Sequence, residues 1–207
     1  MKNKIIFFYF FLASMSMLAQ QKMNENEIKS FKAEVSKTAK EMTSLTADFI
    51  QKKHMKALVN PVESTGKLYV KMPDKVLLET QKPETSAILF KGSKMVIKGN
   101  GKSKEINLEK NKNFKQLNRL IVGTHNGNLL NDDHFTVQYF KEGTTKIVYL
   151  TPKSKEALKY MKQVELYFKG GEASVSEVKM IEPKGDYTVL TFKNKKQNVS
   201  IKEALFN

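Results

Sequence analysis

Apolar and polar residues alternate in three successive stretches between Ser44 and Phe90. A period of two over several residues is typical of a half-buried β-strand, with one apolar face and one face toward water. Turn residues separate the stretches, at 60–61 and again at 73–74. The apolar side of the predicted strands carries Leu45, Ala47 and Phe49, then Gly66, Leu68, Val70 and Met72, then Val76, Leu78 and Thr80.

Shorter alternating stretches continue through most of the remaining chain. Asn100-Gly101 is a strong signal for a two-residue β-hairpin, and Gly-containing turns are expected at 92–93, 142–143 and 170–171. The pattern predicts a mainly β fold of about ten or eleven antiparallel strands that curl into a barrel or a sandwich. Beyond the first three strands, we expect strands at 86–91, 95–98, 102–108, 135–141, 144–151, 161–168, 173–181 and 187–193, and a last segment at 199–206.

One long helix is predicted before the first strand, over residues 23–42, which contain no Gly or Pro. Asn24 or Asn26 is expected to cap its start. A short middle helix is indicated at 114–121, followed by Gly123, and a helical turn at 152–160. The long helix is amphipathic because its apolar residues recur at steps of three and four: Ile28, Phe31, Val35, Ala39 and Met42.

The first 19 residues predict a secretory signal peptide. Lys2 and Lys4 form a basic start, residues 5–18 are an apolar run, and the small residue Ala19 precedes a polar stretch. The alternative, an uncleaved membrane anchor, would need roughly 20 apolar residues, which is more than this run supplies. We therefore expect cleavage near Ala19, export of the protein, and a single mature domain over residues 20–207.

The chain is strongly basic, with a formal net charge of +15. Arg119 is its only arginine, whereas nucleic-acid binders typically use Arg for bidentate contacts, so no nucleic-acid partner is expected. The lysines are spread along the chain, which fits either a solvated surface or transient attraction to an anionic membrane surface. The chain has no Cys, so its stability must come from an ordinary core.

The sequence shows no recognisable catalytic set. His125, Asp132, Asp133 and His134 are residue types that bind metal ions, and an exported metal-dependent enzyme is one alternative. Their spacing matches no metal motif, and neither a phosphate-binding loop nor a nucleophile elbow is present. Glu165 is expected on the solvent face of its strand. We therefore expect no enzyme activity, no cofactor and no metal, and the pattern leaves open whether the apolar faces close onto a core or line a cavity.

Four stretches resemble the LolA family of periplasmic outer-membrane lipoprotein carriers. The stretch SLTADFIQK at 44–52 resembles the family's first strand, and GKLYVKMP at 66–73 resembles its second. The stretch VLLET at 76–80, followed by Pro83 and Gly92, continues in the family's order, and LTPK at 150–153 resembles a later stretch. The resemblance implies an open half-barrel of antiparallel strands, with helices that cover an apolar cavity.

The resemblance also implies a function. Such a carrier, expected to be a monomer, takes acylated lipoproteins from an inner-membrane ABC-type release complex and brings them across the periplasm to the outer membrane, where the sequence identifies no acceptor. It catalyses no reaction. Leu120 and Ile121 on the middle helix are the implied lid residues. The implied acyl-chain cavity is lined by Leu45, Phe49, Leu68, Val70, Met72, Val76, Leu78, Ile88 and Phe90.

The sequence departs from the family pattern at Met72. The resemblance implies an Arg at this position, before the turn Pro, that hydrogen-bonds the lid. Met72 predicts a looser lid, or a lid that apolar packing holds. Two alternatives remain open: a carrier of another lipid or lipid-linked compound, and a sensor or interaction module on the same fold.

Overall fold

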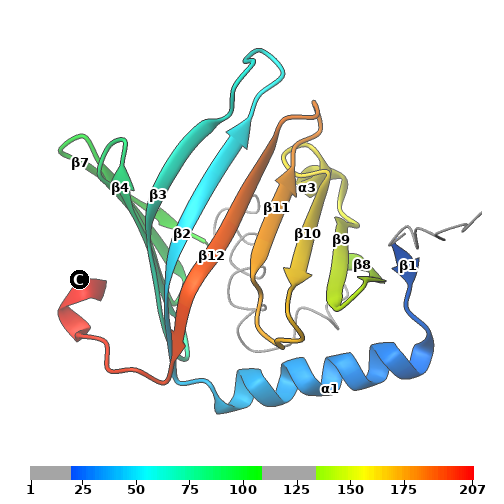
Figure 1. Cartoon of the computed structure of the whole chain (residues 1–207). Helices are drawn as coiled ribbons and strands as arrows, with labels where there is room; N and C mark the ends of the chain where they lie inside the picture. Colours follow the sequence, from blue (N-terminus) through cyan, green and yellow to red (C-terminus); the bar gives the residue numbers. More distant parts are fainter. Residues whose placement is uncertain (1–19, 109–133) are drawn as a thin grey trace, which may run out of the picture.

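The computed structural model describes residues 20–108 and 134–207. Within these residues, twelve antiparallel strands form one curved sheet, with a long helix, a short helix and a 3-10 turn (Figure 1). The helical elements are α1 (Glu25–Glu41), α3 (Lys155–Leu158) and η2 (Glu203–Phe206). The strands are β1 (Gln21–Lys22), β2 (Ser44–His54), β3 (Val62–Lys71), β4 (Lys75–Lys82), β5 (Ser86–Lys91), β6 (Lys94–Gly99), β7 (Lys102–Asn107), β8 (Phe135–Glu142), β9 (Thr145–Pro152), β10 (Gln163–Phe168), β11 (Glu177–Ile181) and β12 (Tyr187–Gln197).

The sheet consists of two meanders joined side by side. Strands β2 to β7 pair in sequence, as do β8 to β12, and the two runs meet where β12 pairs with β2. Strands β1 and β7 lie at the two edges, so the sheet stays open. The predicted mainly β, open half-barrel is confirmed. Strand β1 is an addition, because two residues are too short to show an alternation.

Helix α1 crosses one end of the curved sheet (Figure 1). It begins with a capping box, in which the Asn24 side chain accepts a hydrogen bond from the Glu27 N–H at 3.0 Å and the Asn24 N–H donates to the Glu27 carboxylate at 2.9 Å. Phe31, Val35 and Ala39 are its buried residues, as the helical spacing predicted. The apolar stripe therefore holds the helix against the strand ends.

The inner face of the sheet carries two apolar clusters. One joins α1 to β8, β9 and β10, and its largest fully buried side chain is Phe31. The other lies on β2 to β6 together with Met42 and Leu108, and includes Val70 and Phe90. Each cluster packs on one half of the sheet, and the cavity described below lies between the two clusters.

The outer face of β4 and β5 is apolar, where the alternation predicted a face toward water. Leu77 and Leu89 are buried there against Ile201 and Phe206. The C-terminal segment 199–206 covers this face as an extended stretch that ends in η2, and not as a strand. The prediction that this face is open to solvent is therefore wrong at Leu77 and Leu89, because a segment that is distant in sequence covers them.

Glu165 on β10 is a second exception to the predicted solvent-exposed face. It does lie on the outer face, but it is only 6% exposed. The Tyr167 hydroxyl donates to its carboxylate at 2.6 Å, and the Lys179 ammonium lies 3.3 Å away. Burial, together with the hydrogen bond to Glu165, raises the pKa of Tyr167. The neighbouring strands thus supply the partners that a buried carboxylate needs.

Candidate ligand-binding cavity

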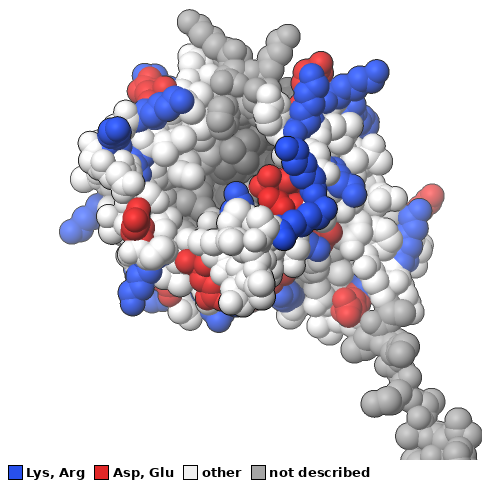
Figure 2. Space-filling model, turned by 90° about the horizontal axis from the view of Figure 1, so that it is seen from above, with Lys and Arg blue, Asp and Glu red and all other residues white. Residues whose placement is uncertain are grey.

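The molecule is hollowed at the end opposite α1, with charged side chains of both signs spread around the hollow (Figure 2). Between the two halves of the sheet lies a cavity of about 260 Å³. This volume is just below the range of roughly 300–1,000 Å³ that is usual for small-molecule sites. The described residues that line it are Val35, Thr38, Ala39, Met42, Leu45, Gln51, Leu68, Val76, Leu78, Ile88, Phe90, Val164, Leu166, Ala173, Ser174, Val175, Val178, Met180, Leu190, Phe192, Lys195 and Gln197.

The first wall of the cavity is built by β2 to β5. Leu68 pairs with Leu78, and Leu78 pairs with Ile88, so these three side chains form a row across three strands. Val76 and Phe90 form the next pair on the same face. Because side chains alternate along each strand, the register fixes both rows toward the cavity.

The second wall is built by β10, β11 and β12. Leu166 pairs with Val178, and Val178 pairs with Leu190, which makes a row that matches the first wall. Val164 and Met180 form a neighbouring pair. None of these residues was predicted to line the cavity, because the resemblance is specific mainly between residues 45 and 92. The alternation at 163–168 and 187–192 was the available signal.

The structure places the nine predicted cavity residues in two groups. Phe49, Val70 and Met72 do not line the cavity, and they lie in the packing around it: Phe49 is buried, and Val70 and Met72 belong to the β2–β6 cluster. The predicted lid residues Leu120 and Ile121 lie outside the described residues, as does the predicted cleavage site near Ala19. The residues that do line the cavity are Leu45, Leu68, Val76, Leu78, Ile88 and Phe90.

Phe49 is held away from the cavity by its cross-strand partner, Gly66. A Cβ atom at Gly66 would lie 2.7 Å from Cζ of Phe49 and would overlap the carbonyl oxygen of Glu79. The ring of Phe49 therefore occupies the space that a side chain at Gly66 would need. This aromatic–glycine pairing covers the backbone of β3 at a point where the β3–β4 register also shifts.

A β-bulge in β12 changes the polarity of one end of the cavity. The register between β12 and β2 shifts between Lys193 and Lys196. Asn194 takes a left-handed conformation there, with φ of 52°, and its amide donates to Asp48 at 2.8 Å. Because the bulge adds one residue, the alternation reverses beyond it, and Lys195 points inward instead of outward.

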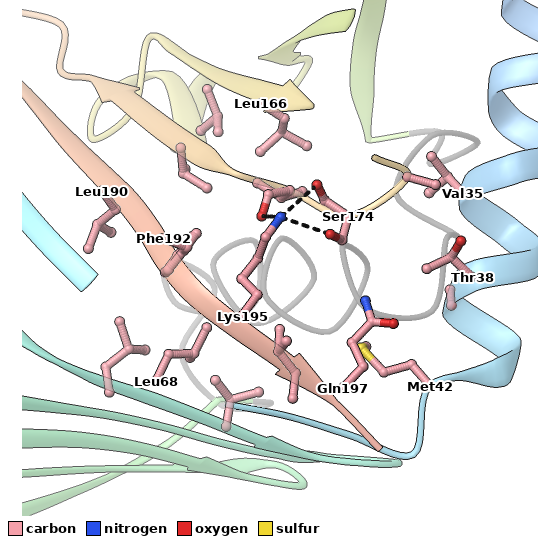
Figure 3. Close-up of a pocket in the computed structure, with 18 of the residues that line it drawn as sticks. Val35, Thr38, Met42, Leu68, Leu166, Ser174, Leu190, Phe192, Lys195 and Gln197 are labelled. Atoms are coloured by element: carbon pink, nitrogen blue, oxygen red, sulfur yellow. Dashed lines mark hydrogen bonds between the residues drawn. The ribbon is translucent and has the colours of Figure 1, made fainter. Parts of the chain in front are cut away.

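The Lys195 ammonium lies at the α1 end of the cavity and points to the loop between β10 and β11 (Figure 3). It donates to the Ser174 hydroxyl at 2.9 Å and to the Ser176 hydroxyl at 3.2 Å, and it forms an ion pair with Glu172. The hydrogen bond from Lys195 lowers the pKa of Glu172. The sequence alone gave no sign of this group, because a bulge cannot be read from the pattern.

Only part of the alternative metal site lies within the residues that the structure describes. His134 is described, whereas His125, Asp132 and Asp133 lie outside the described residues. In the described part of the chain, no group of three or more His, Cys, Asp or Glu side chains is placed to hold a metal ion. Over the same residues, no helix has the length and apolar character needed to cross a membrane.

The fold and the cavity together define an open antiparallel half-barrel that surrounds an apolar cavity. A sequence model of the family described as outer membrane lipoprotein carrier protein LolA matches residues 40–207. Because this match covers most of the chain, the protein belongs to the LolA family, as its sequence predicted. No curated protein matches the sequence.

MucB and a protein from Thermus thermophilus share this fold at low sequence identity. MucB, also solved in complex with MucA from Pseudomonas aeruginosa, is 9% identical with a TM-score of 0.51, and the match covers 89% of this chain and 63% of MucB. An uncharacterized conserved protein from Thermus thermophilus is 11% identical with a TM-score of 0.50, over 86% and 91% of the two chains. A LolA superfamily protein from Nitrosomonas europaea is 12% identical with a TM-score of 0.48, over 87% and 97%.

Proposed function

We propose that the protein is a periplasmic carrier that holds the acyl chains of lipoproteins in its cavity and moves them from the inner to the outer membrane. Membership of the LolA family supports this function. The observation that carries it is the pair of facing apolar rows, Leu68–Leu78–Ile88 on one wall and Leu166–Val178–Leu190 on the other.

The energetics of acyl chains explain why such a cavity is needed. Exposing an acyl chain to water costs about 0.8 kcal/mol per CH₂ group, so an acylated lipoprotein does not leave a membrane unescorted. A carrier must bury enough of the chain to compete with the membrane and still release it. Leu, Val and Ile walls with adaptable Met42 and Met180 supply apolar contacts without a fixed shape.

Several further features belong to this proposal. Residues 1–19 serve as a signal peptide and 20–207 as a single mature domain, which acts as a monomer. Lipoproteins are received from an inner-membrane ABC-type release complex. No chemical step, cofactor or nucleic acid is involved, and the cavity residues contribute only binding.

A transient contact with the membrane surface would complete the transfer. The loop between β2 and β3 projects at the end opposite α1, the end at which the molecule is hollowed (Figures 1 and 2). Val59 at its tip is 100% exposed, and Leu58 is 48% exposed. Lys53 and Lys56 lie close by in the sequence. An apolar tip beside lysines favours docking to an anionic bilayer.

The substitution Leu78→Glu tests the proposed function. Leu78 is at the centre of the first row and only half-buried, so the folded protein can accept the change. A carboxylate in the apolar wall should lower the affinity for a fluorescent fatty acid by about ten-fold or more. The measurement is a titration of the mature protein with this probe, together with mass spectrometry of the acylated cargo that co-purifies.

Leu205→Glu is the matched control, because Leu205 is 37% exposed on η2 and does not line the cavity. It should leave probe binding unchanged. The proposed function is wrong if the wild-type protein carries no acylated cargo and does not bind the probe. The proposed function is also wrong if the folded Leu78→Glu protein binds the fatty-acid probe and the acylated cargo as tightly as the wild type does.

A further inference from the structure

Lys195 is an unusual lining residue for an apolar cavity. Of the described residues that line the cavity, it alone has a charged side chain. This side chain is only 14% exposed, and its ammonium group bonds to protein oxygen atoms in place of bulk water. A desolvated charge needs an anionic partner to offset the cost. The nature of that partner determines which ligands the cavity accepts.

The present anionic partner, Glu172, is weakly held. Its side chain is 54% exposed, and its other described contact is a hydrogen bond from the Ser174 hydroxyl at 3.3 Å. The carboxylate side of this ion pair is open to solvent, so an incoming anion can replace Glu172 at Lys195 while water solvates the released carboxylate. The hydroxyl groups of Ser174 and Ser176 and the Val175 carbonyl oxygen would still accept from Lys195 after such an exchange.

Two further polar side chains stand at the same end of the cavity. Figure 3 shows Gln197 between Lys195 and helix α1, and Thr38 on α1 itself. Within the described residues, neither has a side-chain hydrogen-bond partner, so both are available to a ligand. Gln197 is exposed, which keeps this end partly hydrated. A charged, partly hydrated end next to long apolar walls has the polarity of an amphiphile with a headgroup and a tail.

We propose that the cavity binds a single-chain anionic amphiphile whose carboxylate or phosphate headgroup replaces Glu172 at Lys195. Its tail would lie between the two apolar rows, and Gln197 and Thr38 would hydrogen-bond the headgroup. This inference rests on the proposed function, because it assumes that the cavity accepts acyl chains. It adds a headgroup preference, set by the bulge at Asn194 that turns Lys195 inward.

The test compares three ligands that share one tail: dodecanoate, dodecyl phosphate and dodecanol. Titration calorimetry at neutral pH should show that at least one of the anions binds the mature protein roughly 10-fold or more tightly than the neutral alcohol. The reason is that only an anionic headgroup forms a hydrogen bond between two charged groups with Lys195. The two anions distinguish a carboxylate from a phosphate preference. Lys195→Met should reduce the preference to about 2-fold or less, and Lys195→Arg should retain most of it.

Two more variants keep the test decisive. Glu172→Gln removes the competing carboxylate and should tighten anion binding by roughly 2- to 5-fold. Lys196→Met removes an equal charge from an exposed neighbour that does not line the cavity, and should leave the preference intact. Equal affinity of the wild type for dodecanoate, dodecyl phosphate and dodecanol would overturn the inference and leave the carrier function standing, as would a preference that survives Lys195→Met. Binding of none of the three would overturn the inference, and together with the absence of co-purifying acylated cargo it would overturn the carrier function as well.

Discussion

The contact between Phe49 and Gly66 shows how a single missing side chain shapes the cavity. Phe49 has the inward parity of a lining residue, and the resemblance implied that it is one. The space left by Gly66 instead takes up its ring, and Phe49 is buried without lining the cavity. The volume of a neighbour, which decided this placement, cannot be read from the alternation.

At this scale we predict that Gly66→Ala destabilises the protein by about 2 kcal/mol or more, because the new Cβ overlaps both backbone and ring atoms. Urea unfolding followed by far-UV circular dichroism measures the effect. Gly99→Ala is the matched control, since its Cβ would meet only Ser86 Cβ, at 3.4 Å. An equal loss in both variants would show that the crowding at Gly66 is not the cause.

The inward direction of the Lys195 side chain could not be predicted from the sequence. In strict alternation with Leu190 and Phe192, it would point outward. One additional residue, Asn194 in the left-handed conformation, reverses the parity. The sequence KNKK at 193–196 contains no glycine or proline to reveal the bulge, so the charge in the cavity became visible only with the register of β12 against β2.

Among the elements, the strands and α1 were predictable, because period-two and helical patterns are local. The Asn24 cap could also be expected from the sequence. The C-terminal segment was not, because its place depends on Leu77 and Leu89, which precede it by more than a hundred residues. Its extended backbone resembles a strand in sequence, but it pairs with no neighbouring strand of the described sheet.

The C-terminal segment is held by ionic contacts as well as by Phe206. Lys71 donates to the Glu203 carboxylate at 2.7 Å, and Lys75 also pairs with it. These hydrogen bonds lower the pKa of Glu203 from 4.5 to about 2. Because the folded-state pKa is depressed, the stabilising contribution is complete above pH 4.5 and is lost as the pH falls through about 2.

We therefore predict that the amide protection of residues 201–206 decreases as the pH is lowered from 4.5 to 2, where the carboxylate takes up a proton. Hydrogen exchange, corrected for the intrinsic rate at each pH, measures the protection. In Glu203→Gln this pH dependence should disappear. The control variant Glu63→Gln alters the ion pair between Glu63 on β3 and Lys52, and it should retain the pH dependence. A pH dependence that is the same in both variants would contradict the prediction.

At the scale of the whole molecule, the β2–β3 loop gives the carrier proposal a second test. The double substitution Leu58→Asp and Val59→Asp places two charges on an exposed apolar tip. Partition to anionic vesicles, measured by co-sedimentation, should decrease about ten-fold or more, because these side chains no longer enter the bilayer interface. Fatty-acid binding should not change, since neither residue lines the cavity.

The control for the loop is Leu205→Asp, another exposed apolar position, which lies on η2 beside the outer face of the sheet. It should bind vesicles as the wild type does. Equal loss in both proteins would assign the effect to net charge and not to the loop. Unchanged vesicle binding of the double variant would remove the loop from the proposed docking surface.

The open sheet has a consequence for the size of the ligand. A closed barrel has a circumference fixed by its strand number and shear, and its interior can grow only if backbone hydrogen bonds break. Here β1 and β7 are both edges, and the two meanders meet along the single seam between β12 and β2. A rotation of the two halves about that seam would leave the ladders within each half of the described sheet intact. Side-chain packing, and not a closed ring of backbone hydrogen bonds, therefore sets the capacity of the cavity, and the proposed carrier would accommodate tails of different bulk.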